Sequence, residues 1–218
     1  PTKLSGLIDT NTHALYPNEA YICTSAQGKN LYLSAFLSLP EDYTPVIASK
    51  KRDDPKQVAK TDLFCVFLRS DTNVELENFS GVYITIGPNG NIYDAFEKID
   101  WAGGTASRDA KRDYDINAVS RISDNQWVVE LKISMEDTGV KAGDSFSVSL
   151  GYNLHGHGKR RLVYKDHPNW FDHNQAFSVA RFTELGIHDG FGELFQGVVN
   201  PEVSIINQSR KKETGRVG

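Results

Sequence analysis

Apolar and polar residues alternate along much of the chain with the period of two that is typical of β-strands. Residues 127–133 show this pattern clearly, because one face is wholly apolar and the other carries Glu130 and Lys132. Residues 63–69 are instead almost wholly apolar, which predicts a strand buried on both faces. Further strands are predicted at residues 20–24, 31–39, 82–86, 92–96, 116–122, 145–152, 176–184 and 192–199.

Turn-forming residues separate these segments. The Asn-Gly pair at residues 89–90 readily adopts the positive φ angles of a tight turn, so it predicts a hairpin with the strands on either side. Residues 123–126 predict a second hairpin in the same way. Residues 102–114 are polar and predict a long loop, and residues 134–139 predict a single helical turn capped by their first residue, a serine.

This succession of strands predicts an all-β fold, a two-sheet antiparallel β-sandwich of the immunoglobulin or jelly-roll kind. The 11% aromatic content beside a single Met also favours sheet over helix. A length of 218 residues suits one large β domain. We therefore expect a single domain over residues 1–207 and a flexible tail over 208–218, which is polar and basic.

Charge and hydropathy argue against nucleic acid and membrane as partners. The net charge of −4 gives no general attraction for nucleic acid, and no apolar run approaches the ~20 residues of a membrane-spanning helix. The chain begins without Met or a signal-peptide pattern, so we expect a piece of a longer protein. Cys23 and Cys65 lie in apolar segments and predict either buried thiols or a disulfide between neighbouring strands in an oxidising compartment.

Five segments follow one another in the order of a known family. They are residues 28–36 (Gly-Lys-Asn-Leu-Tyr-Leu-Ser-Ala-Phe), 61–68 (Thr-Asp-Leu-Phe-Cys-Val-Phe-Leu), 83–90 (Tyr-Ile-Thr-Ile-Gly-Pro-Asn-Gly), 127–134 (Trp-Val-Val-Glu-Leu-Lys-Ile-Ser) and 189–194 (Asp-Gly-Phe-Gly-Glu-Leu). Together they resemble the family-9 carbohydrate-binding modules and their wider β-sandwich relatives, which include the DOMON-type cytochrome domains. Thr61 and Cys65 stand where the family pattern has acidic residues.

The resemblance implies a sugar held between two aromatic rings. Trp127 lies in phase with core residues, whereas Trp101 and Trp170 lie among loop residues with polar neighbours and are the better candidates for stacking on a sugar. Planar side chains that can hydrogen-bond to sugar hydroxyls follow in the segment 153–161, for which the alternative is an exposed glycine-rich turn. The polar contacts we predict are Tyr93, Asn153, His155, His157 and Arg160.

The sequence also bears on possible zinc, calcium and haem sites. The histidines of residues 155–173 lack a helix-borne His-Glu pattern or a Cys pair, which argues against zinc. The resemblance implies structural calcium, and the predicted ligands are Asp53, Asp54, Asp62 and Asp71. DOMON relatives ligate haem iron through Met, but Met135 is the only Met, is expected to be buried, and no Cys-x-x-Cys-His motif is present.

No catalytic motif stands out, because the acidic pairs lie in hydrophilic loops and no nucleophile elbow or phosphate loop is present. The resemblance, together with the aromatic residues in loops, implies a non-catalytic carbohydrate-binding module of a larger secreted polysaccharide-active protein, located outside the cell or in the periplasm. Its expected partners are an oligo- or polysaccharide and the flanking domains of the parent chain. The alternatives are an interdomain or adhesion sandwich that binds no sugar, and a haem-binding DOMON-type domain.

Overall fold

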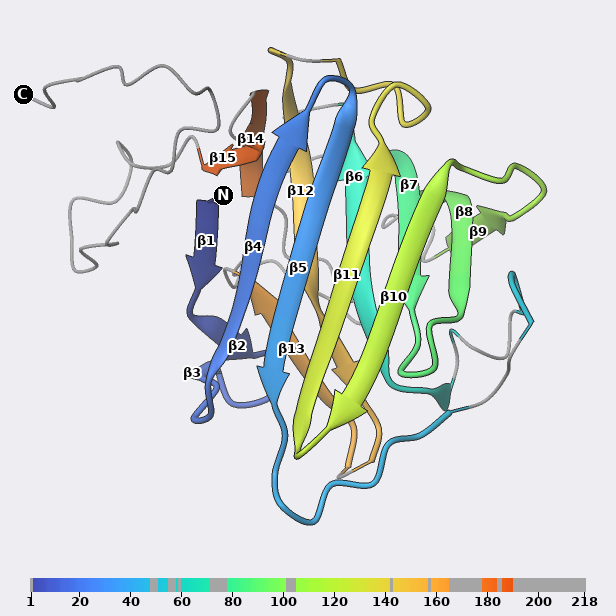
Figure 1. Ribbon diagram of the computed structural model, residues 1–218. Coiled ribbons are helices and arrows are strands. Elements are labelled where there is room, and N and C mark those ends of the chain that lie inside the picture. Colours follow the sequence, from blue (N-terminus) through green and yellow to red (C-terminus); the bar gives the residue numbers. More distant parts are fainter. Residues whose placement is uncertain are drawn as a thin grey trace, which may run out of the picture.

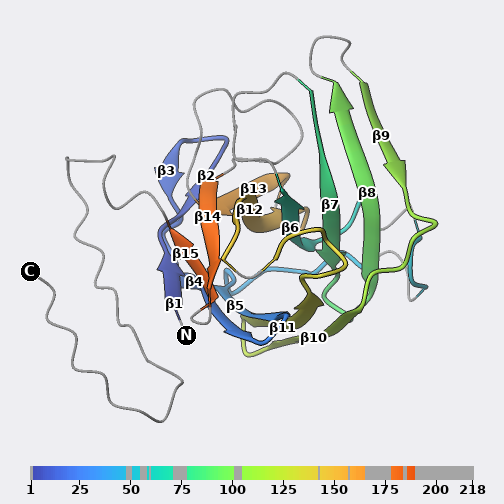
Figure 2. The same cartoon turned by 90° about the horizontal axis from the view of Figure 1, so that it is seen from above.

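The computed structural model describes residues 2–47, 51–54, 58, 60–70, 78–100, 105–141, 143–156, 158–164, 178–183 and 186–189. These residues form two antiparallel sheets packed face to face (Figures 1 and 2). The predicted all-β sandwich is therefore confirmed. Within the described chain, no helix has the length and apolar character needed to cross a membrane.

Sheet A has five strands and lies in front in Figure 1. In spatial order these are β1 (Thr2–Ser5), β4 (Ala20–Gln27), β5 (Asn30–Ser38), β11 (Gln126–Ser134) and β10 (Ile116–Ser123). The two tight hairpins, β4–β5 and β10–β11, pair with each other through β5 and β11.

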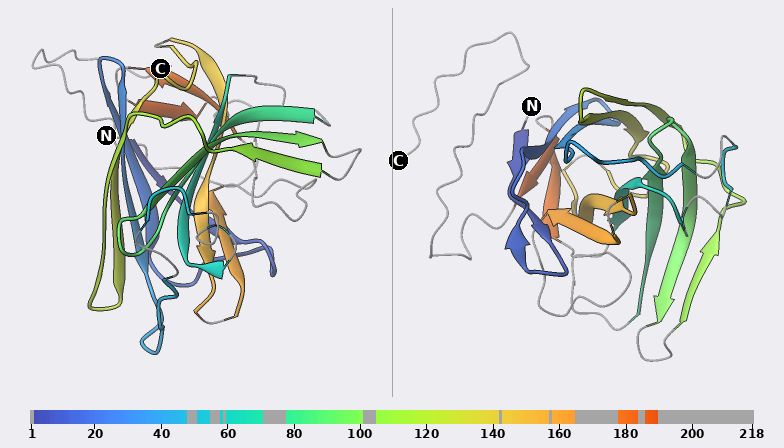
Figure 3. Two further views of the ribbon diagram at one scale, coloured as in Figure 1. Left: turned by 90° about the vertical axis from the view of Figure 1, so that its right-hand side faces the viewer. Right: turned by 90° about the horizontal axis from the view of Figure 1, so that it is seen from below.

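Sheet B lies behind sheet A and has eight strands in its main path. In spatial order these are β3 (Ala14–Leu15), β2 (Leu7–Asp9), β13 (Arg160–Tyr164), β12 (Ser145–Leu154), β6 (Leu63–Arg69), β7 (Asn78–Ile86), β8 (Ile92–Asp100) and β9 (Thr105–Asp109). Figure 3 (left) shows β7, β8 and β9 turned steeply away from the strand direction of sheet A, as sheet twist requires.

The hairpin of β14 (Ser178–Thr183) and β15 (Gly186–Asp189) completes the sandwich. One edge of β12 is divided between two partners, because its first four residues pair with β14 and its last four with β13. β15 also contacts β4 and β1 of sheet A. The hairpin therefore bridges the two sheets on the side where β1 lies.

Side chains from both sheets meet in one core. Along sheet A every second residue is buried, and along β6 all seven residues are, which confirms the strand predicted to be buried on both faces. At the centre, the ring of Trp127 meets that of Tyr152 edge-on at 5.2 Å between centroids, and Tyr152 packs against Phe64 at 5.1 Å. The Trp127 indole N–H donates to Ser120 Oγ at 2.8 Å. Trp127 is a core residue, as its strand phase predicts.

Several strands were not predicted from the sequence. The segment expected to be a loop over 102–114 contains β9, whose polar residues pair through the backbone with β8 at the end of sheet B. The alternation pattern also did not predict the N-terminal strands β1, β2 and β3 or the short strand β13. Residues 135–139 form turns closed by bonds from Thr138 N to Met135 O and from Gly139 N to Glu136 O, not the predicted capped helical turn. The predicted strand 192–199 and tail 208–218 lie outside the described residues.

The two cysteines lie on different sheets. Cys23 is half-buried on the outer face of β4, and Cys65 is buried on the outer face of β6, so the sandwich separates them. Both thiols are free. The alternative of a disulfide between neighbouring strands is therefore wrong, since these strands belong to different sheets.

Replacing Trp127 by Ala should lower the free energy of unfolding by about 3–5 kcal/mol, since it removes the largest ring between the sheets. Urea denaturation followed by circular dichroism measures this change. Leu15→Ala is the matched control, because Leu15 is 68% exposed and its truncation should cost no more than about 0.5 kcal/mol. Equal effects of the two substitutions would contradict the assigned core.

Candidate ligand-binding site

The face of sheet B that points away from sheet A carries polar side chains among aromatic ones; we call it the outer face of sheet B. It holds Tyr93 on β8 and Asn153 on β12, two of the predicted ligand contacts. Cross-strand pairing places Thr85 between Cys65 and Tyr93, and Asn153 beside Arg161 of β13. The strands therefore bring together groups that lie far apart in the sequence.

Charged groups on this face are held in fixed positions. Arg108 Nε lies 2.6 Å from Glu97 Oε1, and the Arg108 guanidinium lies 4.5 Å from the centroid of the Tyr83 ring. Glu97 is fully buried, and Arg69 and Arg161 are only 1% and 9% exposed. Planar guanidinium groups present several N–H donors in a rigid array, which suits a ligand with neighbouring hydroxyl or carboxylate oxygens.

The neutral groups of the face are hydrogen-bond donors at neutral pH. Burial raises the pKa values of Tyr83 and Tyr93, and it raises the pKa of the Cys65 thiol to about 12, so all three stay protonated. The Thr85 hydroxyl is fully buried and has no hydrogen-bond partner among the described residues. Since buried polar groups are nearly always paired, this hydroxyl is suited to meet a polar atom brought by a ligand or a water molecule.

The other predicted contacts lie elsewhere or cannot be placed. His155 is half-buried just after β12, and Arg160 is exposed at the start of β13, with its Nε 3.9 Å from Asp9 Oδ2. Strand alternation puts Arg160 on the opposite side of β13 from Arg161. Trp101, Trp170 and His157 lie outside the described residues.

Sequence reasoning missed most of the charged groups on this face. Arg69 ends the apolar strand β6 in phase with Cys65 and Phe67, and this alternation was visible in the sequence. Arg161 follows Arg160 directly, and only the strand pairing decides which of the two meets Asn153. No sequence signal links Glu97 to Arg108, because their pairing depends on the unpredicted strand β9.

His155 belongs to a network that fastens the chain after β5 to the end of β12. The two oxygens of the Asp62 carboxylate accept hydrogen bonds from the backbone amides of Val46 (3.0 Å) and His155 (2.6 Å). The Gly156 amide donates to the Tyr43 hydroxyl at 3.2 Å. A Cβ on Gly156 would lie 2.2 Å from the carbonyl oxygen of Thr44, so only glycine fits here. Burial lowers the pKa of His155, which keeps the imidazole neutral at pH 7.

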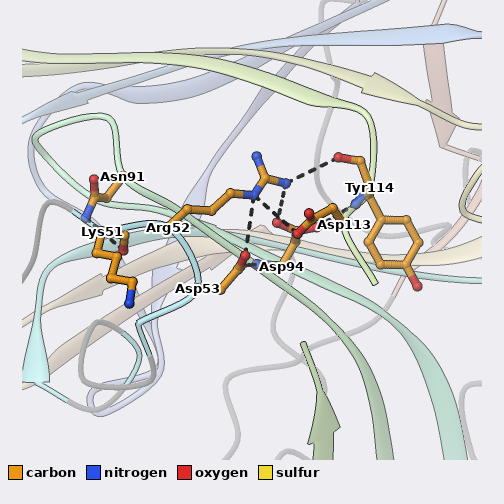
Figure 4. A network of polar contacts seen from close by, with 7 residues as sticks. All are labelled: Lys51, Arg52, Asp53, Asn91, Asp94, Asp113 and Tyr114. Atoms are coloured by element: carbon orange, nitrogen blue, oxygen red, sulfur yellow. Dashed lines mark hydrogen bonds and ion pairs between the residues drawn. The ribbon is translucent and has the colours of Figure 1, made fainter. Parts of the chain in front are cut away.

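A second cluster gathers three carboxylates around one guanidinium (Figure 4). Within the described chain, Asp53, Asp94 and Asp113 form the one group whose carboxylate oxygens lie within 4.8 Å of one another. The Arg52 side chain lies among them, with Nη2 2.6 Å from Asp94 Oδ1 and Nε 3.4 and 3.7 Å from Asp53 Oδ2 and Asp113 Oδ1. The loop of residues 51–54 is thereby tied to β8 and to the segment before β10.

This cluster of carboxylates contains one of the predicted calcium ligands. Asp53 belongs to it, whereas Asp62 lies in the network described above and Asp71 lies outside the described residues. Burial raises the Asp94 pKa, and the Tyr114 amide and Arg52 counteract that rise. Both Asp94 oxygens already accept hydrogen bonds, and calcium prefers six to eight oxygen ligands. As arranged, these carboxylates fit a guanidinium better than a calcium ion.

The comparisons with known proteins show a likeness of fold. No family model and no curated protein sequence matches the chain. A proposed carbohydrate-binding protein from Bacteroides uniformis superposes with a TM-score of 0.53 at 9% identity, over 82% of this chain and 84% of that one.

Two structures of a family-9 carbohydrate-binding module from Caldicellulosiruptor kristjanssonii also match. The complex with glucose gives a TM-score of 0.45 at 13% identity, over 78% of this chain and 76% of that one. The complex with cellotriose gives 0.42 at 14% identity, over 76% and 80%. The likeness to the Bacteroides uniformis protein agrees with the β-sandwich fold that the resemblance implies.

Replacing Asp62 by Ala should release the segment that includes Val46, because two backbone amides lose their acceptor. Each unsatisfied amide costs about 1–3 kcal/mol. Hydrogen exchange should show faster exchange of the Val46 and His155 amides, with little change in β10 and β11. Glu41→Ala removes an exposed carboxylate from the same segment and serves as the control. Unchanged protection at both amides would contradict the network.

Arg52→Gln tests what balances the charge of the three carboxylates. We expect calcium to raise the thermal midpoint of the variant more than that of the parent protein, because removal of the guanidinium leaves an uncompensated cluster. Thermal melts with calcium and with a chelator measure the difference. A larger calcium effect on the parent protein than on the variant would show that the ion binds without displacing Arg52.

Proposed function

We propose that this chain is a non-catalytic carbohydrate-binding domain that takes its ligand at the outer face of sheet B. The observation that carries the proposal is the set of polar groups that lie buried beside aromatic rings on that face. It combines the guanidinium of Arg161, the amide of Asn153, the hydroxyl of Thr85 and the ring of Tyr93. Sugars need such a combination, since their rims are hydroxyls and their faces are C–H groups.

Chain connectivity supports the role proposed for the two loop tryptophans. Trp101 directly follows β8, the strand that carries Tyr93. In the sequence, Trp170 lies between β13 and β14, which share one edge of β12, the strand that carries Asn153. We propose that their indoles hold the sugar rings while the polar groups of the strands bind the hydroxyls. His155 and His157 remain proposed contacts at the rim, whereas Arg160 lies on the opposite side of β13 from Arg161.

The fold likeness supports carbohydrate as the ligand class. The Bacteroides uniformis protein is a proposed carbohydrate-binding protein, and the Caldicellulosiruptor kristjanssonii modules were solved with glucose and cellotriose. On the same resemblance we propose that the chain is an accessory module of a larger secreted polysaccharide-active protein, beside flanking domains. A haem-binding role finds no support, since Met135 is fully buried in the core between the sheets.

A glycan array followed by titration calorimetry tests the proposal. The double variant Trp101→Ala, Trp170→Ala should weaken binding to the glycan that the parent protein selects. Arg161→Lys should weaken binding about tenfold, which corresponds to about 1.4 kcal/mol, because a lysine cannot reproduce the planar donor array.

Arg121→Ala is the control for these variants, because Arg121 is exposed on sheet A, on the other side of the sandwich. Circular dichroism of each variant confirms that the sandwich is intact. Failure of the parent protein to bind any glycan would overturn the proposed function. Unchanged binding by both site variants would overturn the site while leaving the function standing.

A further inference from the structure

A groove crosses the outer face of sheet A, on the opposite side of the sandwich from the site proposed above. It has a volume of about 610 Å³, within the range of about 300–1,000 Å³ typical of small-ligand sites. Figure 1 looks onto this face, with β4, β5, β11 and β10 side by side. The lining residues come from these four strands: Cys23, Thr24, Ser25, Tyr32, Leu33, Ser34, Asn117, Ala118, Val119, Glu130, Leu131 and Lys132.

The pairing register explains why a groove forms here. Cys23 and Ser34 are directly opposite each other on β4 and β5, and both are small. On one side of this pair, the larger Tyr32 lies between Ser25 and Lys132 in the next row of side chains. The small pair therefore forms the floor, and the Tyr32 ring forms part of a wall.

A pair of aromatic rings follows on the other side of the floor. Tyr21 and Phe36 are opposite each other in the next row and stack with 5.0 Å between ring centroids and 13° between ring planes. The ammonium of Lys3 lies 4.1 Å from the centroid of the Tyr21 ring. The floor of small side chains thus lies between two rows that contain aromatic residues.

The polar groups of the groove carry no net charge. At its β11 side it is lined by one acid, Glu130, and one base, Lys132, and at its β10 side by the amide of Asn117. Val119, which is 65% exposed, adds an apolar surface at the same end. An aromatic ring, an amide, hydroxyls and a balanced charge pair suit a neutral ligand with hydroxyl rims and apolar faces.

The length of the groove favours a chain over a single sugar. Because neighbouring strands lie about 4.8 Å apart, a groove across four strands extends about 14 Å. The two outer faces of a sandwich point in opposite directions, so one short ligand cannot occupy both sites. Binding in this groove would therefore be independent of binding at sheet B.

We propose that the groove on sheet A is a second binding site that takes a neutral linear oligosaccharide. This inference rests on the proposed function, since it assigns the same ligand class to a separate surface. The domain would then contact two glycan chains, or two stretches of one long polysaccharide, at the same time. Such divalent binding strengthens attachment to an insoluble polymer without any new contact at either site.

Backbone amide chemical shifts test the second site. The ¹H–¹⁵N spectrum of the protein is titrated separately with cellotriose, xylotriose, mannotriose and chitotriose, and with trigalacturonic acid as an anionic probe. At least one neutral trisaccharide should shift the amides of Ser25, Tyr32, Ser34 and Lys132. Trigalacturonic acid should shift them less, because the groove offers no excess positive charge.

Two variants check that the shifts arise in the groove. Ser34→Phe should abolish them by filling the floor, and Tyr32→Ala should weaken them by removing the wall. Ser5→Phe is the matched control, because Ser5 is exposed on β1 of the same sheet, outside the groove, and the shifts should persist. Since all three side chains face away from the core, the variants should fold, and the spectra themselves report this.

The outcomes separate this inference from the proposed function. Shifts at Tyr93 and Asn153 with no shift in the groove would overturn the second site and support the first. Shifts in the groove that persist in Ser34→Phe, or that are as large with trigalacturonic acid, would also overturn it. Shifts at neither face with any probe would overturn both. Shifts in the groove that Ser34→Phe removes and Ser5→Phe retains would establish the site.

Discussion

The structure depends on the burial of one face of each sheet against the other. Trp127 of sheet A and Tyr152 of sheet B meet in the middle of this interface, and neither ring is accessible to solvent. In a strand, burial of every second side chain forces the side chains between them to the outside. The packing that holds the sandwich together therefore also determines which residues lie on each outer face.

Most of the strands could be predicted because their side chains serve this interface. β4, β5, β6, β10 and β11 alternate or are continuously apolar since they supply the core, and that pattern is visible in the sequence. β9 and the N-terminal strands could not be predicted in this way. They are short and lie toward the ends of the sheets. There, backbone hydrogen bonds are enough to hold a strand in the sheet, and polar side chains are tolerated.

The face proposed to bind the ligand could be predicted only in part. Tyr93 and Asn153 were identified by residue type, and both lie on the outer face of sheet B. The choice between Arg160 and Arg161 depends on register, because a shift of one residue moves a side chain to the opposite face. Likewise, Asp94 and Asp113 join Asp53 only through the fold, so no local motif could reveal this cluster. Local periodicity can therefore be read from the sequence, whereas contacts between residues far apart in the chain are poorly predicted from it.

The hairpin of β14 and β15 makes the two lateral margins of the sandwich unequal. On its own side, it closes the space between sheet B and the β1–β4 margin of sheet A. On the opposite side, β9 and β10 end their sheets, and each has one row of backbone groups without a neighbouring strand in the described chain. A polypeptide that joined this domain by β-augmentation would dock along that margin, where these backbone groups are available.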